Sequence, residues 1–427
     1  MSSGAPRTTP HASTRAVILD VIRAAGTISR VGIVAATGMT GATISTVVRG
    51  LIDDGLVVET GRAESTGGKR RVLLQLDPGA RFAVGIHLDH AGLTYALTDL
   101  SGAVVARTSR PGPGSAAPGE VVARMAQEAA TLVRGAGIDR TRLLGFGLVF
   151  PGPLASGGGM AVTPPSLRPW LGYPLGDELR RVAGLPVFLE NDASAAGLGE
   201  LWSGGVDASA TFAAIYMGTG IGSGLLVNGL PFRGASGNTG EVGHVCLDLD
   251  GPECWCGARG CLEALAGPAA VVEQARADRR LAKVAGLRRK SPESASVLTD
   301  FGALSRAARR GDAGAVALLD RSARYVAVAV RTLANVMDLE SVVLTGPSFA
   351  IAGASYLPAI RDELDHAFFA RTAHIPDVRL SRAAATAPAI GGAAMVLQSE
   401  LVPLHDGLRL PGNVSAGETP LAEPISP

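Results

Sequence analysis

The sequence has little that would place it outside the class of folded globular proteins. No uninterrupted apolar run reaches the roughly 18 residues that a membrane-spanning helix needs, and the first apolar run, residues 16–22, contains Asp20. The charge is nearly balanced, with 39 basic and 38 acidic side chains, and 47% of the residues are hydrophobic, which excludes a disordered chain. We therefore expect a folded, cytoplasmic protein with no membrane partner.

Cysteine is also scarce, and its distribution is uneven. The four cysteines of this 427-residue chain all lie between positions 246 and 261, which in a long chain favours a metal over disulfides. Cys254, Cys256 and Cys261 surround a glycine-containing turn, and His244 precedes them. Three thiolates and one imidazole form the closed tetrahedral set of a structural zinc ion. Cys246 is the alternative fourth ligand, since in a strand it would point to the same side as His244.

Net charge changes sign along the chain. Residues 1–76 carry nine basic and five acidic side chains, a net charge of +4, and the remaining 30 basic and 33 acidic side chains give −3. The basic end is therefore the better candidate for binding nucleic acid. We expect one domain over residues 14–77 and a second over residues 78–400, between a disordered tail of residues 1–13 and a flexible tail of residues 401–427.

Within residues 14–77 the pattern predicts three helices and a hairpin. The helices are expected from Thr14 to Ala25, from Ser29 to Gly38 and from Thr40 onward, because hydroxyl side chains cap helix starts and glycine ends helices. Two short strands follow at residues 56–60 and 71–76.

The third predicted helix has a small, polar outer face. Its apolar side chains fall on one side at helical spacing (Ile44, Val48, Leu51 and Ile52), and the other side carries Ala42, Thr43, Thr46 and Arg49. The hairpin loop adds three consecutive cations, Lys69, Arg70 and Arg71. Such a helix suits the major groove of double-stranded DNA, and such a loop suits phosphates. Together they predict a winged helix-turn-helix; the alternative is a small helical module for protein contacts.

After residue 80 the pattern becomes that of an α/β domain, in which strands and then helices recur twice. The first series is predicted at residues 82–88, 93–100, 103–108, 120–134 (a helix) and 143–150. The second is predicted at residues 186–190, a helix from Asp192, 211–217, 223–227, and helices around 263–275 and 313–336. This recurrence predicts two similar lobes. The 56 glycines are expected at turns and at close backbone approaches.

Several short motifs in the second domain resemble those of the ROK family of repressors and sugar kinases. They are Gly240-Glu-Val-Gly-His244, the Cys-x-Cys-x4-Cys run with Leu262-Glu263, Pro151-Gly-Pro153, Glu190-Asn-Asp192 and Gly218-Thr-Gly-Ile-Gly222. The resemblance implies a two-lobed, actin- and hexokinase-like (ribonuclease H-like) α/β domain, split near residues 192–200, whose C-terminal helix returns to the first lobe. An α+β winged helix-turn-helix before it is typical of the repressor branch.

The resemblance also implies a sugar or sugar phosphate in the cleft between the lobes. Carried over position by position, the residues that bind it are Asn191, Asp192, Glu241, His244 and Glu263, and Asp192 matches the general base of the kinases. The alternative for Glu190 to Asp192 is that they only cap the next helix. Ser166 stands where the family usually has a sugar-binding asparagine, which leaves the identity of the sugar open.

The phosphate-binding turn of the ROK kinases is not retained. Aligned on Asp99 and Gly102, His87 replaces the family's aspartate, and Asp89, His90 and Ala91 replace Gly-Gly-Thr. An anionic Asp89 would repel phosphate oxygens. The paired glycines of the second nucleotide element also become Gly346-Pro347.

We therefore predict no catalytic residue and no enzymatic activity. The predicted function is that of a zinc-containing, sugar-responsive transcriptional repressor of carbohydrate uptake or catabolism genes. It would act as a homodimer or homotetramer on a DNA operator. The alternatives are an ATP-dependent, glucokinase-like sugar kinase with an appended DNA-binding domain, and a sugar sensor that docks another protein.

Overall fold

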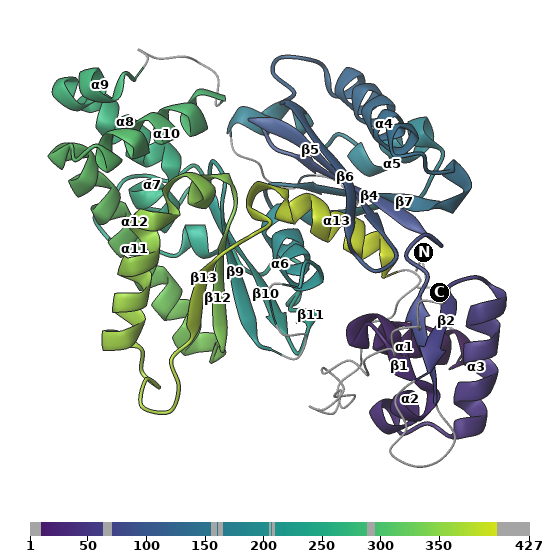
Figure 1. Cartoon of the computed structure of the whole chain (residues 1–427). Helices are drawn as coiled ribbons and strands as arrows, with labels where there is room; N and C mark the ends of the chain where they lie inside the picture. The colour runs from purple at the N-terminus through teal and green to yellow at the C-terminus, as the bar shows by residue number, and fades with distance from the viewer. Residues whose placement is uncertain are drawn as a thin grey trace, which may run out of the picture.

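The computed structural model describes residues 10–62, 71–154, 160, 165–204, 206, 210–287 and 295–398. An N-terminal domain of three helices and a small sheet is followed by two lobes, each built on a five-stranded sheet (Figure 1). This is the expected order of an α+β domain and a two-lobed α/β domain. Among the described helices, none combines the length and apolar character that crossing a bilayer requires.

The N-terminal domain begins with helix α1 (Pro10–Ala25), followed by β1 (Ile28–Ser29), α2 (Arg30–Thr37), α3 (Gly41–Asp53), β2 (Val57–Arg62) and β3 (Val72–Leu76). The strands lie in the order β1-β3-β2. Both expected hydroxyl caps are present: Ser29 Oγ accepts the N–H of Gly32, and Thr40 Oγ1 accepts the N–H of Thr43, each at 3.2 Å. These caps confirm the predicted starts of α2 and α3.

One expectation for this domain was wrong, and one element was missed. Helix α1 begins at Pro10, before the expected Thr14, because the fixed φ of proline suits the first turn of a helix. The two-residue strand β1 was not expected, since it is too short to give a periodic pattern; it is held by its antiparallel pairing with β3, Ile28 opposite Leu74.

The two lobes have the same sheet topology, which confirms the prediction of two similar lobes. The first sheet has the order β6-β5-β4-β7-β8 and the second has the order β11-β10-β9-β12-β13. In each sheet, the three strands that come first in the chain pair antiparallel with one another. The last two strands are added parallel to the first strand of the sheet. The first lobe consists of β4 (Phe82–Leu88), β5 (Gly92–Asp99), β6 (Val104–Pro111), α4 (Pro118–Gly135), β7 (Leu143–Phe150), α5 (Leu175–Ala183) and β8 (Val187–Asn191).

The second lobe carries more helices than the first. Its strands are β9 (Phe212–Met217), β10 (Ile221–Val227), β11 (Leu230–Pro231), β12 (Ser341–Thr345) and β13 (Asp377–Leu380), and its helices are α7 (Leu262–Ala266), α8 (Pro268–Ala277), α9 (Arg279–Ala285), α10 (Ala295–Arg309), α11 (Ala313–Met337) and α12 (Pro347–Ala367). The single helix expected around residues 263–275 is in fact two, because Gly267 takes an extended conformation and Pro268 starts a new helix.

Helices α6 (Asp192–Trp202) and α13 (Ala387–Leu397) join the two lobes (Figure 1). Helix α13 packs on α6 and on strands β4 and β7, so the C-terminal helix does return to the first lobe. Glycines line these contacts: a Cβ on Gly85 would lie 1.7 Å from the carbonyl oxygen of Ala389, and one on Gly391 would lie 1.7 Å from that of Ala195. The backbones touch directly, which explains part of the glycine excess.

Substituting Gly391 with alanine is expected to destabilise the fold. The added methyl group has no space beside Ala195, so the helices must separate, at a cost of about 1–3 kcal/mol in the free energy of unfolding. Gly135→Ala is the matched control, since Gly135 also lies in a helix but a methyl group there would meet no atom within 4 Å. Urea unfolding of both variants measures the difference, and equal stability would contradict the close contact.

Candidate functional site

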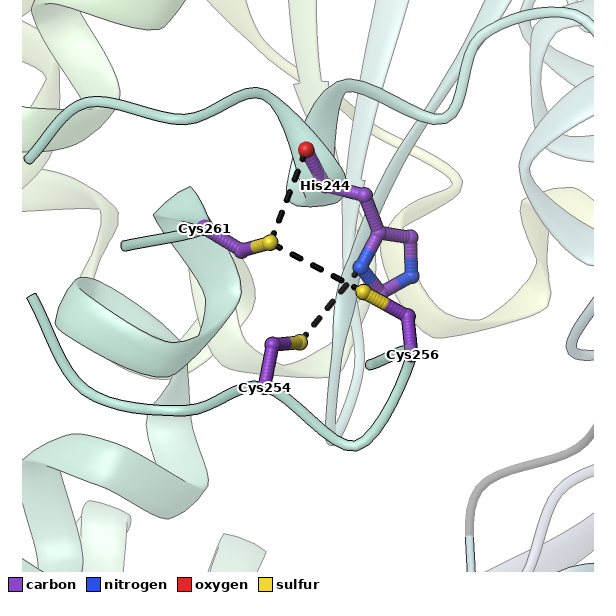
Figure 2. Close-up of side chains that lie close together, drawn as sticks. All are labelled: His244, Cys254, Cys256 and Cys261. Atoms are coloured by element: carbon purple, nitrogen blue, oxygen red, sulfur yellow. Dashed lines mark hydrogen bonds between the residues drawn. The ribbon is translucent and has the colours of Figure 1, made fainter. Parts of the chain in front are cut away.

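The four predicted metal ligands lie together beside the interlobe region. His244 ends the short 3-10 helix η3 (Val242–His244), Cys254 and Cys256 lie on the following loop, and Cys261 precedes α7 (Figure 2). Their ligand atoms all lie within 4.8 Å of one another. Cys246 is exposed and lies outside this cluster.

The spacing of these atoms fits the tetrahedral coordination of one metal ion. Zinc–sulfur bonds of about 2.3 Å place two sulfurs of a tetrahedron about 3.8 Å apart, and the Sγ atoms of Cys256 and Cys261 lie 3.8 Å apart. The Nδ1 atom of His244 lies 3.6 Å from Cys254 Sγ. Burial raises the pKa of the Cys261 thiol to about 12, and a dication would offset that burial cost by stabilising thiolates. The cluster could therefore hold a metal ion.

A cavity of about 530 Å³ lies between the lobes next to this cluster. Its lining includes all five residues that the family resemblance assigns to sugar binding: Asn191, Asp192, Glu241, His244 and Glu263. Asp89, Tyr216 and Trp255 line it as well. A concave site with several convergent polar side chains has the usual character of a small-molecule site.

Asn191 and Asp192 have structural roles in addition to lining the cavity. Asn191 Oδ1 accepts the N–H groups of Ala193 at 2.9 Å and Ser194 at 3.1 Å, so it caps α6, and its Nδ2 donates to the carbonyl of Gly152. Asn191 therefore caps α6, as the alternative expected, but it does not only cap, because it also lines the cavity. Asp192 Oδ1 accepts the N–H of Ala193, which leaves its Oδ2 directed to His87 Nε2 at 3.7 Å.

Glu263 links the metal loop to the turn between β9 and β10. Its Oε1 accepts the indole N–H of Trp255 at 2.6 Å, and its Oε2 accepts the N–H of Ile221 at 2.8 Å. The Trp255 ring also packs edge-on against His244, with centroids 5.0 Å apart. The metal loop and the cavity wall thus share hydrogen bonds. Trp255 was missed as a site residue; its place between two predicted ligands was the available signal.

Glu241 lies among other acids. Burial raises its pKa to about 7, and the charges of Asp192 and Glu263 add to this effect. A carboxyl group with such a pKa exists in both forms near neutral pH. It can therefore donate a hydrogen bond to a ligand hydroxyl as well as accept one.

The turn between β4 and β5 contains Asp89, His90 and Ala91, the residues that we expect at the position of the kinase phosphate turn. The N–H of Asp89 donates to the carbonyl of Gly92 at 2.9 Å, and the N–H of His90 donates to Asp89 Oδ1 at 2.6 Å. Burial raises the pKa of Asp89. These two backbone donors already have partners within the turn.

Helix α3 presents the predicted outer face. Ala42, Thr46 and Arg49 are exposed, and Thr43 is half-buried with its Oγ1 2.9 Å from that of Thr40. The opposite side buries Ile44, Val47, Val48 and Leu51, while Ile52 is only half-buried. Arg71 is exposed just before β3. Lys69 and Arg70, and the side chain of Ser166, lie outside the described residues.

Comparisons with known proteins relate the sequence and the fold to one family. The sequence model of the ROK family matches residues 83–399. The chain is 26% identical to the xylose repressor of Bacillus subtilis, over 87% of this chain and 91% of that protein, and 28% identical to the glucokinase of Halalkalibacterium halodurans, over 75% of this chain and 96% of the kinase.

A solved structure has the same fold over nearly the whole chain. It is that of a ROK family transcriptional regulator described as a homologue of the Escherichia coli MLC protein, with a TM-score of 0.67 and 24% identity, covering 92% of this chain and 97% of that one. The family model matches most of the chain, including both lobes. The chain therefore belongs to the ROK family.

Proposed function

We propose that the chain is a sugar-responsive transcriptional repressor of carbohydrate uptake or catabolism genes. One observation carries this proposal: an N-terminal domain with an exposed polar and basic helix face is joined to a two-lobed domain whose interlobe cavity contains several convergent polar side chains. The match to the xylose repressor extends over 87% of the chain, whereas the glucokinase match, though it covers 96% of the kinase, leaves a quarter of this chain unmatched.

Residues 14–77 would form the DNA-binding domain and residues 78–400 the sugar-binding domain. Helix α3 would enter the major groove through Ala42, Thr43, Thr46 and Arg49, with Lys69, Arg70 and Arg71 on phosphates of the flanking backbone. A homodimer or homotetramer would place two such helices on a palindromic operator.

Retention of the sugar-facing residues without the phosphate turn supports binding rather than phosphorylation. A nucleotide phosphate is held by free backbone N–H groups, and those of Asp89 and His90 donate to Gly92 and to the Asp89 carboxylate. The alternative function, an ATP-dependent sugar kinase, is supported by the glucokinase relative and by Asp192 at the cavity wall.

A structural zinc ion would be held by His244, Cys254, Cys256 and Cys261. When bound, it would fix the loop that carries Trp255, and through Trp255 the position of Glu263. His244 would use Nδ1 for the metal, and its other ring nitrogen would remain for the sugar.

Loss of positive charge from the proposed DNA surface is expected to weaken operator binding. Arg49→Ala should cost about 1–3 kcal/mol if Arg49 contacts a base edge. Replacing Lys69, Arg70 and Arg71 together by alanine should reduce the dependence of affinity on salt, because fewer counterions are released. Titration of the DNA upstream of the gene at several salt concentrations measures both effects. Arg324→Ala, an exposed arginine on α11, is the control, and affinities equal to that of the wild type would refute this DNA surface.

Removing one thiol from the cluster is expected to remove the metal and the sugar response together. Elemental analysis should find about one zinc per wild-type chain and much less in Cys256→Ser. Cys246→Ser is the matched control, because Cys246 lies outside the cluster. A metal-free Cys256→Ser protein that binds sugar normally would contradict the link through Trp255 and Glu263.

Neutralising Asp192 is expected to impair sugar binding and leave sugar-free operator binding intact. In Asp192→Asn, the side-chain oxygen can still accept the N–H of Ala193, while the charge that would hold a sugar hydroxyl is lost, a cost of roughly 1.5–3 kcal/mol. Calorimetry with D-xylose and D-glucose tests this, with Asp320→Asn on the exposed side of α11 as the control. ATP hydrolysis at an ordinary kinase rate with either sugar and magnesium would favour the kinase alternative.

A further inference from the structure

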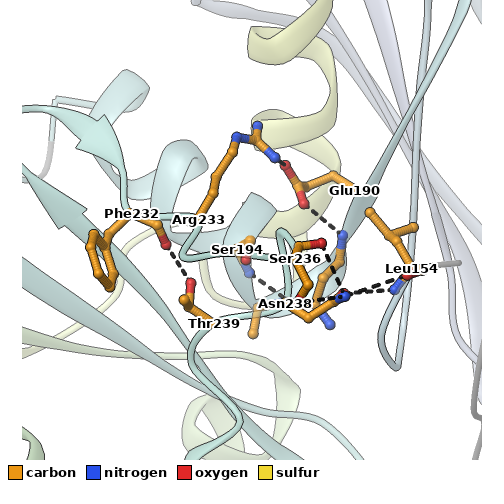
Figure 3. A network of polar contacts seen from close by, with 10 residues as sticks. Leu154, Glu190, Ser194, Phe232, Arg233, Ser236, Asn238 and Thr239 are labelled. Carbon is orange, nitrogen blue, oxygen red and sulfur yellow. Dashed lines mark hydrogen bonds and ion pairs between the residues drawn. The ribbon is translucent and has the colours of Figure 1, made fainter. Parts of the chain in front are cut away.

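A loop of the second lobe makes polar contacts with residues of the first lobe (Figure 3). This crossing loop, residues 232–240, follows β11 and leads into Glu241. Arg233 pairs with Glu190 of β8 at 2.5 Å. Asn238 pairs with both backbone groups of Leu154, accepting its N–H at 2.7 Å and donating to its carbonyl at 3.4 Å. Two independent polar contacts therefore join the lobes here.

The Glu190 carboxylate depends on this contact. Glu190 is only 4% exposed, and its Oε1 accepts the N–H of Asn191 at 3.1 Å while its Oε2 faces Arg233. A buried carboxylate without a cation is costly. Moving the lobes apart would withdraw Arg233 from Glu190, so the ion pair favours the arrangement in which the lobes are together.

Both ends of the contact adjoin residues that line the cavity. Glu190 directly precedes Asn191 and Asp192, and Leu154 lies two residues after Gly152, whose carbonyl accepts Asn191 Nδ2. On the other lobe, the crossing loop ends at Gly240, whose carbonyl accepts the N–H and the hydroxyl of Ser223. Neither Arg233 nor Asn238 is among the described residues that line the cavity.

We propose that Arg233 and Asn238 are positioning residues that couple sugar binding to the relative position of the two lobes. This inference rests on the proposed sugar-responsive function. A ligand that contacts Asn191 and Asp192 on one lobe and Glu241 on the other draws the lobes together, and the crossing loop adds its contacts only in that arrangement. By linkage, the same contacts strengthen sugar binding and enlarge its effect on operator affinity.

Arg233→Met and Asn238→Ala are each expected to weaken binding of D-xylose or D-glucose by roughly 3- to 30-fold, a usual size for such coupling. They should also reduce the sugar-induced change in operator affinity, while sugar-free operator affinity stays unchanged or rises. X-ray scattering should show a smaller sugar-induced compaction than in the wild type. Arg233→Lys retains the cation and should restore most of the sugar affinity.

Two further variants separate coupling from stability. Glu190→Gln keeps an oxygen for the N–H of Asn191 and removes the buried charge, so adding Arg233→Met to it should have little further effect on sugar affinity. Arg181→Met is the matched control, because Arg181 pairs with Glu178 within the first lobe at 2.8 Å; it should match the wild type in every measurement.

The outcomes distinguish this proposal from the function on which it rests. If the wild type binds neither sugar and shows no operator response, the proposed function is wrong and the coupling role is lost with it. If the wild type responds to sugar and the Arg233 and Asn238 variants match it in affinity and compaction, only the coupling role is wrong. The coupling role would also be wrong if the Arg233→Met and Asn238→Ala variants lost stability and sugar-free operator binding together and Arg233→Lys did not restore them.

Discussion

Direct backbone contact between α6 and α13 joins the two lobes and positions the central strands of the two sheets on either side of the helix pair. Helix α6 packs against β10 of the second sheet and α13 packs against β4 and β7 of the first, so the two lobes are joined through the pair. The contact requires glycine wherever a carbonyl oxygen of one element faces the backbone of another, as at Gly199 and Gly391.

The cavity lies at the start of α6, and this position explains why its side chains serve two purposes. Asn191 accepts two N–H groups of the first turn of the helix and lines the cavity at the same time. On the opposite wall, Glu263 fixes the first residue of β10 and the indole of Trp255. The polar side chains are therefore oriented by the fold before any ligand binds, which reduces the entropy cost of binding.

Burial, together with the charge of neighbouring acids, raises the pKa of Glu241 and of Asp89, and the arrangement of the acids at the cavity favours ligands that are rich in hydroxyl groups. Glu241 and Glu263 line the cavity from the second lobe, whereas Asp192, which follows β8, and Asp89, which follows β4, line it from the first lobe. A sugar offers hydroxyls that donate to carboxylates and accept from carboxylic acids, so it can satisfy both forms. His87 adds an imidazole beside Asp192, with its Nε2 atom 3.7 Å from Asp192 Oδ2.

Features whose geometry is set within a few residues of chain could be predicted from the sequence. The caps at Ser29 and Thr40, the strands 82–88 and 143–150, and the Cys-x-Cys-x4-Cys loop are of this kind. The lining of the cavity was predictable only through the family motifs, since spacing alone does not bring residue 191 to residue 263. Groups that are distant in the chain meet only in the packed molecule: the contact of His87 with Asp192, the bond of Trp255 to Glu263 and the ion pair of Arg233 with Glu190 join separate strands and loops. Local propensities specify each element, but the burial of charge and the close approach of backbones are properties of the packed chain alone.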